Sequence, residues 1–235
     1  LIHFVNEIAK DFPDKTISTL AYQYTRKPPK TKPLENVLIT LCSIECDRSI
    51  PIDEGCKDFS SDLKGWSILT DNIRIWDYTT QFTNFLAPFP NWGTIKPNIN
   101  LFVQNNAKWI FEQHSRNDSE LFELRSYVMA KLLWDPSLNF NTLIKDFNDK
   151  YYGDGGKYIT EYISKIQSQI DNTSFFLFLY GDPSQGFDSF LSPQNLSNYD
   201  KLFDKALSKV DYNSNYYNRI LRSKVSIDYA ILELY

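Results

Sequence analysis

Four places in the first half of the chain combine side chains that can act on or hold a sugar. Each place follows a short apolar run and mixes acids, aromatic rings, amides and cations: Tyr22, Tyr24 and Arg26; Glu45, Asp47 and Arg48; Trp76, Asp77 and Tyr78; Glu112, Gln113 and His114. Flat aromatic rings can carry the apolar face of a pyranose, and an Arg can hold a sugar carboxylate through paired hydrogen bonds. These residue types therefore indicate carbohydrate chemistry, and all twelve are candidate site residues.

The carboxylates in this set could support hydrolysis. Cleavage of a glycosidic bond needs one carboxylic acid and one carboxylate, about 5 to 9.5 Å apart. Glu45, Asp47 and Asp77 are the candidate catalytic carboxylates, and the other residues are candidate substrate contacts. The alternatives are structural. Asp77 could cap the next helix, pair with an Arg, or bond the backbone of Thr79 and Thr80 as an Asx turn, and Arg48 could pair with Glu45 or Asp47.

A parallel sheet would bring these residues together. Strand-like apolar runs cover residues 16 to 24, 36 to 46, 72 to 79 and 107 to 113, and helix-compatible stretches cover 57 to 70 and 98 to 106, the latter just after Pro97. Alternating strands and helices are typical of βαβ units, in which the carboxyl ends of the strands share one edge. The sequence therefore predicts an α/β fold whose site lies on that edge.

The second half reads as helices. Apolar stripes predict helices around residues 121 to 132, 140 to 151, 159 to 170, 194 to 210 and 215 to 235, and Gly153 is a predicted helix end. The loop from Asn172 to Pro193 carries many aromatic residues, so we expect it to pack against the protein.

Composition excludes several classes of protein. The formal net charge of −4 argues against nucleic-acid binding, because a phosphate backbone selects a basic surface. No apolar run is long enough to span a bilayer. Cys42, Cys46 and Cys56 are an odd set with poor zinc spacing, so we interpret them as buried thiols. With only His3 and His114 as histidines, we expect no metal site and no cofactor, although His114 could act as a single base.

Four segments resemble a known family: "LAYQYTRKPPK", "LCSIECDRSIPI", "IWDYTTQFTNFLAPFPN" and "FEQ…ELFELRSYVMAKLLWDP". From about residue 4 to about residue 153 the chain is similar to large bacterial proteins known as domain of unknown function 4838. The resemblance implies a glycoside hydrolase barrel, similar to the α-glucuronidase and β-hexosaminidase (β/α)₈ enzymes, followed by a helical region. It also implies an exported protein that acts on carbohydrate, with uronic acids or N-acetyl sugars as candidate substrates.

The same resemblance implies that the four strands are the last four of a barrel. Glu45, Asp47 and Asp77 would be bases or sugar contacts, and Glu112 would hold sugar hydroxyls. In the similar enzymes the general acid ends the fourth strand, which this sequence does not contain. We therefore expect a half-barrel that contacts a missing N-terminal half and is inactive alone.

The sequence thus predicts a partial (β/α)₈ barrel over residues 1–135 and a helical extension over 136–235, in a protein that binds or hydrolyses carbohydrate. One alternative is a carbohydrate-binding protein without catalysis. Another is a helical interaction module, residues 117 to 235, on a barrel scaffold.

Overall fold

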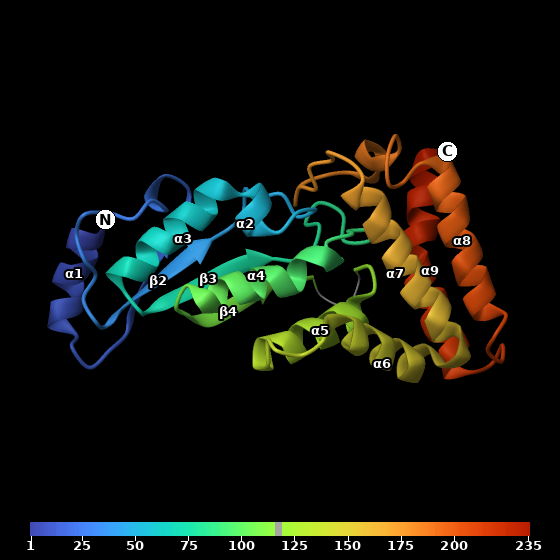
Figure 1. Cartoon of the computed structure of the whole chain (residues 1–235), viewed down its shortest axis with the longest axis horizontal. Helices are drawn as coiled ribbons and strands as arrows, with labels where there is room; N and C mark the ends of the chain where they lie inside the picture. The colour runs from blue at the N-terminus through green and yellow to red at the C-terminus, as the bar shows by residue number, and fades with distance from the viewer. Residues whose placement is uncertain (116–118) are drawn as a thin grey trace.

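The computed structural model describes residues 1–115 and 119–235. Its centre is a parallel sheet of four strands in the order β1-β2-β3-β4 (Figure 1). The strands are β1 (Ile17–Ala21), β2 (Val37–Cys42), β3 (Ile73–Tyr78) and β4 (Ala107–Gln113). Each predicted apolar run contains one of these strands, and the predicted parallel α/β sheet is confirmed.

The helices of this part are α1 (Ile2–Asp11), α2 (Ile52–Gly55), α3 (Lys57–Leu69) and α4 (Trp92–Gln104). The prediction that a helix begins after Pro97 was wrong, because α4 begins at Trp92 and contains Pro97. The proline removes one backbone donor. The buried side chains of Trp92, Ile95 and Ile99 lie on both sides of the proline and pack in the hydrophobic core, which stabilises the helix there.

The two faces of the sheet differ. On one face Ile39, Ile73 and Ile75 are fully buried in a core shared with α3 and α4. Side chains of the alternate positions point to the other face. There Trp109 and Phe111 are 59% and 47% exposed. We call this second side the open face.

The helical region follows the sheet and contains α5 (Phe122–Trp134), α6 (Phe140–Tyr152), α7 (Gly156–Asp171), α8 (Pro193–Leu207) and α9 (Asn215–Leu234). Gly153 ends α6 with a φ of 57°, as predicted. Short 3-10 turns lie at Gln23–Thr25, Gly153–Gly155 and Pro183–Gly186. The helices α7, α8 and α9 stand at the opposite end of the molecule from α1 (Figure 1).

A second hydrophobic core joins the helical region to the sheet. It contains Leu124, Ile166 and Phe203 of the helices together with Tyr78 and Trp92. The predicted division near residue 135 falls between α5 and α6, which share this core. The helices therefore bury their apolar stripes partly against residues that precede position 117. None of the helices in residues 1–115 and 119–235 is long and apolar enough to cross a membrane.

Candidate functional site

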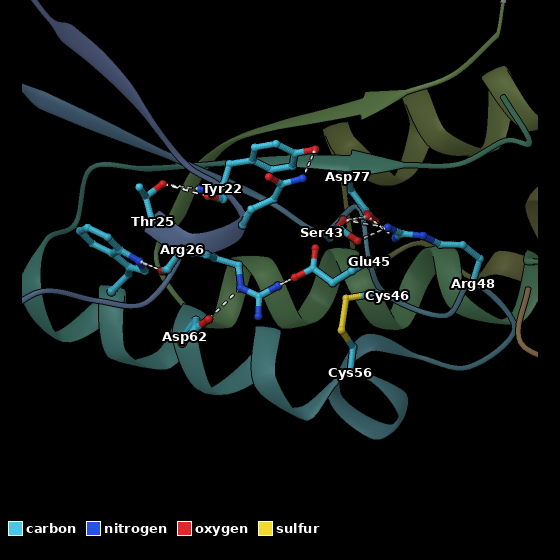
Figure 2. Close-up of polar contacts among 12 residues, drawn as sticks. Tyr22, Thr25, Arg26, Ser43, Glu45, Cys46, Arg48, Cys56, Asp62 and Asp77 are labelled. Atoms are coloured by element: carbon cyan, nitrogen blue, oxygen red, sulfur yellow. Dashed lines mark hydrogen bonds and ion pairs between the residues drawn. A yellow bond between two sulfur atoms is a disulfide. The ribbon is translucent and has the colours of Figure 1, made fainter. Parts of the chain in front are cut away.

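The carboxyl ends of the strands and the loops that follow them form an edge of the sheet that we call the rim. Near its centre Ser43, Arg48 and Asp77 form a buried cluster (Figure 2). Arg48 Nη1 lies 2.5 Å from Asp77 Oδ1, the Ser43 hydroxyl donates to the same oxygen, and Arg48 Nη2 donates to the Ser43 carbonyl. Arg48 is 1% exposed and Asp77 is 3% exposed. A carboxylate is stable at this depth because a guanidinium and a hydroxyl bond it directly.

The direction of Asp77 follows from the strand. Asp77 lies on the same face of β3 as Ile73 and Ile75, whose side chains are buried toward the helices, whereas Trp76 and Tyr78 belong to the open face. Because it is buried and paired, the geometry favours a structural role for Asp77 over the predicted catalytic one.

The structural alternative in which Asp77 pairs with an Arg is confirmed, whereas the partners named for the Asx turn and for Arg48 were wrong. Thr79 donates its N–H to the Gln113 carbonyl (3.0 Å), and Asp77 bonds Ser43 and Arg48, so the predicted Asx turn was wrong. Arg48 pairs with Asp77 rather than with Glu45 or Asp47, because its guanidinium points to the end of β3.

Arg26 lies against α3 and contacts two carboxylates. Its Nε lies 2.7 Å from Asp62 Oδ2, and its Nη1 contacts Glu45 (Figure 2). The Arg26 side chain is 9% exposed, whereas the Glu45 side chain is 43% exposed. Of the three candidate catalytic carboxylates, Glu45 is therefore the one that keeps contact with solvent.

The predicted tyrosines of the first strand end lie differently. The backbone N–H of Tyr22 donates to Thr25 Oγ1 (3.2 Å) and closes the 3-10 turn, while its side chain is partly buried. The Tyr24 side chain is 93% exposed. The structure thus does not bring Tyr24 into the cluster of the other rim residues.

Asp47 organises the loop that contains it. One oxygen, Oδ1, accepts from the Ser49 N–H (2.8 Å), the Ser49 hydroxyl (2.7 Å) and the Leu177 N–H (3.0 Å). Asp47 is 8% exposed. This predicted catalytic residue therefore ties the rim to a segment that is distant in the sequence.

A disulfide fixes the same loop. Cys46 and Cys56 are bonded with their Cα atoms 5.4 Å apart, and Cys42 is a buried free thiol (Figure 2). The prediction of thiols was therefore wrong for Cys46 and Cys56. Their spacing in the sequence gave no sign of the pairing, because it depends on the loop after β2 returning to the start of α3. Burial raises the pKa of the Cys42 thiol to about 11, which makes this thiol unreactive.

Aromatic contacts extend along the open face. Trp76 Nε1 donates to Gln113 Oε1 (2.7 Å), and the Trp76 ring meets Phe111 edge to face at 5.2 Å. Tyr78 is 7% exposed and contacts Phe82 at 6.0 Å. The amide oxygen of Gln113 thus accepts its hydrogen bond from Trp76 within the protein.

Glu112 and His114 have strongly shifted acidities. Glu112 is the register partner of Asp77 on β4, and its Oε2 has no hydrogen-bond partner within the described residues. Burial, and then the nearby Asp77 carboxylate, raise the pKa of Glu112 well above its usual value. Burial and the Arg125 charge lower the pKa of His114 to about 3, so its ring is neutral at pH 7 and stacks on Phe122.

A row of aromatic residues that the predicted site omitted completes the rim. In residues 175–180, which we call the aromatic segment, Leu177 and Leu179 are buried while Phe176, Phe178 and Tyr180 are 54%, 36% and 53% exposed. This alternation is that of an extended chain. The outward rings contact one another in order along the chain. The ring centroids of Phe176 and Phe178 are 6.0 Å apart, and those of Phe178 and Tyr180 are 5.5 Å apart.

Hydrogen bonds hold the aromatic segment on the rim. Leu177 accepts from the Arg48 N–H (2.9 Å), and Leu179 accepts from the Phe82 N–H (2.8 Å). With the bond from Leu177 to Asp47, these contacts attach the segment to the loops after β2 and β3. The expectation that the loop 172–193 packs against the protein is confirmed, but its exposed rings were not foreseen. The alternation of Phe, Leu and Tyr in residues 176–180 was the available signal.

A groove of about 600 Å³ opens beside this segment. Its walls are the aromatic side chains of Phe175, Phe176, Phe178 and Tyr180 and the polar ones of Glu45 and Gln185. The arrangement presents flat apolar surface next to a carboxylate and an amide. Among the described residues, no group of three or more His, Cys, Asp and Glu side chains is placed to hold a metal ion.

Comparison with known families matches residues 1–164 to the family described as Domain of unknown function (DUF4838). No curated protein and no solved structure matches the chain. The match covers more than half of the sequence, including the sheet, α5, α6 and the first part of α7.

Proposed function

We propose that this chain, which belongs to the DUF4838 family, binds carbohydrate at the rim of its sheet. The observation that carries the proposal is the row of exposed rings at Phe176, Phe178 and Tyr180 on a segment fixed by hydrogen bonds. Large aromatic side chains are usually buried, and exposed ones on a rigid support indicate a contact surface. Rings that touch in sequence suit a chain of pyranoses.

Polar groups beside the rings support sugar over a purely apolar ligand. Glu45 and Gln185 line the same groove, and a carboxylate and an amide can bond sugar hydroxyls. Pockets that bind small molecules commonly combine apolar walls with a few oriented polar groups. The groove therefore fits an amphipathic ligand with one flat face and many hydroxyls.

We further propose that the sheet is half of a (β/α)₈ barrel. Parallel sheets are normally covered on both faces, yet the open face leaves Leu20, Trp109 and Phe111 between 44% and 59% exposed. The strands β1 and β4 each have one neighbour in the described sheet. Further strands that close the barrel would cover the open face and pair with both edges.

Binding without catalysis is the form of the proposal that the geometry favours. Asp47 and Asp77 are both buried and bonded within the protein, and Glu45 contacts Arg26. The helical interaction module is less favoured, because the core of the helical region includes Tyr78 and Trp92.

One observation favours hydrolysis as a second candidate. Glu112 and Asp77 are register partners on neighbouring strands, and the pKa of Glu112 is raised beside the carboxylate of Asp77. A neutral acid next to a carboxylate is the pair that glycoside hydrolysis uses. This candidate predicts that Glu112→Gln abolishes sugar release and leaves sugar binding intact.

We propose that the protein is exported from the cytosol. The Cys46–Cys56 disulfide is a bond that persists in oxidising environments such as the periplasm or the cell surface. A carbohydrate-binding protein outside the cytosol also meets polymeric substrates directly.

Calorimetry with a panel of hexasaccharides tests the proposed binding. We expect at least one neutral, N-acetylated or uronic member to bind the chain, and Phe178→Ala and Tyr180→Ala each to weaken that binding about tenfold, since an aromatic contact is worth up to about 1.5 kcal/mol. Tyr212→Ala is the matched control, because Tyr212 is 73% exposed in the segment between α8 and α9.

Two results would overturn this proposal. One is the absence of binding across the whole panel by a chain that unfolds cooperatively. The other is a chain whose self-association, rather than sugar affinity, is lost in Phe178→Ala, which would make the row of rings a protein contact. Reducing-sugar release in the same samples separates hydrolysis from binding alone.

A further inference from the structure

The charges around the groove indicate which sugars it accepts. Glu45 is the charged side chain that lines the groove, and within the described residues no Lys or Arg lines it. A uronic acid carries a carboxylate that needs a cation, often an Arg with paired hydrogen bonds. The question is therefore whether Arg26 or Arg48 can reach a ligand.

Both guanidinium groups are committed to internal partners. Arg48 is 1% exposed and binds Asp77 and Ser43. Arg26 binds Asp62 from inside the protein and Glu45 from the solvent side, so Glu45 covers the guanidinium where it would face the groove. The side chains of Arg26 and Asp62 are 9% and 10% exposed, which confines this pair to the interior.

The amide of Gln185 is also oriented. Its Oε1 accepts from the Asp182 backbone N–H (3.1 Å) and closes a capping box on the 3-10 turn Pro183–Gly186. The amide nitrogen of the same group is a donor with two hydrogens. Glu45 thus offers acceptors and Gln185 offers donors, which together match a hydroxyl or an acetamido group.

We propose that the groove binds neutral sugars, N-acetylated ones included, and that Glu45 is the residue that excludes uronic acids. The inference rests on the proposed carbohydrate binding and adds its substrate class. The Glu45 carboxylate accepts hydrogen bonds from sugar hydroxyls, and it repels a second carboxylate at the same place because like charges in contact are unfavourable. It also removes Arg26 as a site for that carboxylate. Specificity here comes from a repulsive group as well as from attractive ones.

The test compares three hexasaccharides, of glucose, of N-acetylglucosamine and of galacturonic acid, by calorimetry on the 235-residue chain. We expect a neutral or N-acetylated hexasaccharide to bind more tightly than the uronic one. Glu45→Gln should weaken neutral binding and narrow the gap to the uronic hexasaccharide by about fivefold, the upper range for an exposed charge contact. Glu161→Gln is the matched control, since Glu161 is also exposed and also paired, with Lys165 at 3.3 Å.

Salt provides a second measurement that needs no variant. Repulsion between Glu45 and a uronic sugar is screened at high salt, so any residual uronic affinity should rise with ionic strength. If a cation captured the uronic carboxylate, the affinity would fall instead.

The outcomes separate this inference from the proposal beneath it. Tighter binding of the uronic hexasaccharide, lost in Phe178→Ala, overturns the neutral class and leaves carbohydrate binding intact. Neutral preference that Glu45→Gln does not change overturns the role of Glu45. A chain that binds none of the three sugars, and none of the wider panel, contradicts the proposed function itself.

Discussion

Two sets of residues lie at the rim, and their side chains point in opposite directions, one into the protein and the other toward solvent. The strand-end charges Asp47, Arg48 and Asp77 turn inward and bond one another or the backbone, and each is 8% exposed or less. The aromatic segment turns Phe176, Phe178 and Tyr180 outward. These three charged side chains thus bond within the protein, whereas the aromatic rings form exposed surface.

The difference shows that residue type alone does not determine whether a side chain at a sheet edge is buried or exposed. A buried carboxylate needs partners in order to be stable, so a charge near a strand end is drawn into whatever cation and donors lie nearby. An exposed aromatic ring has no such requirement, and a rigid backbone must hold it in place. Asp47 connects the two sets, because its carboxylate accepts the Leu177 N–H and so positions the aromatic segment.

The largest expected effect is on the inward set. Asp77→Ala leaves the Arg48 guanidinium and the Ser43 hydroxyl without their acceptor in the interior. We expect the free energy of unfolding in urea to fall by about 3–5 kcal/mol, the cost of breaking a buried ion pair. Asp149→Ala, which breaks the exposed pair with Lys145, should change it by about 0.5 kcal/mol or less. Asp77→Ala that keeps full stability and sugar binding but loses sugar release shown by the native chain would instead restore the catalytic interpretation.

The disulfide provides the next effect in size. It closes a loop that carries Asp47 and Arg48 between Cys46 and Cys56, a separation of 10 residues. Replacing both cysteines by Ser should lower the free energy of unfolding by about 2–3 kcal/mol, the cost expected from chain entropy for a short loop. Reduction of the native chain should give the same loss, and reduction of Cys42→Ala should too, because that variant keeps the Cys46–Cys56 bond, whereas the double Ser variant should not respond to reductant. Equal stability of the reduced and oxidised chains would contradict this account.

Glu112 should show a smaller, pH-dependent effect. Its folded pKa is raised above the usual 4.5, so the folded state holds the proton more tightly, and the associated stability is present below pH 4.5 and lost as the pH rises through the folded pKa. Glu112→Gln keeps a neutral side chain at every pH. We therefore expect the variant to be more stable than the native chain at pH 8 and equal to it at pH 4, as measured by urea unfolding at both pH values.

His114 affects the free energy of unfolding in the opposite pH direction, and its effect must be separated from that of Glu112. Its folded pKa is lowered from 6.5 to about 3, so its contribution is present above pH 6.5 and lost as the pH falls toward 3. Both proteins in the Glu112 comparison contain His114, so its effect cancels in their difference. A difference between the two proteins that does not vary with pH would contradict the raised pKa of Glu112.

Much of the fold could be predicted from the sequence, and the site only in part. The run at Val37–Cys42 is buried at every position and marks β2 well, because a strand of a parallel sheet that is covered on both faces needs apolar residues at successive positions. The face on which a strand-end side chain lies depends on the register of the strand, and a shift of one residue would exchange the faces of Asp77 and Trp76. The residue types at these positions do not show which register the strand adopts.

Contacts between distant segments were the other missing information. The Cys46–Cys56 bond and the hydrogen bond from Leu177 to Asp47 both depend on how loops return to the rim. The second joins residues 130 positions apart, with the helices α2 to α7 between them in the sequence. Local patterns describe each end of such a contact and not the meeting of the two ends.

The smallest expected effect is that of Tyr24→Ala, which tests whether the sugar contacts the strand ends or the aromatic segment. Tyr24 ends the first strand run and is a predicted sugar contact, yet its side chain is 93% exposed and does not line the groove. Tyr24→Ala should change the free energy of unfolding by about 0.5 kcal/mol or less, as at other surface positions, and leave hexasaccharide affinity unchanged. Calorimetry beside Tyr180→Ala gives the comparison within one residue type. If Tyr24→Ala weakens binding as much as Tyr180→Ala, the sugar follows the strand ends rather than the aromatic segment.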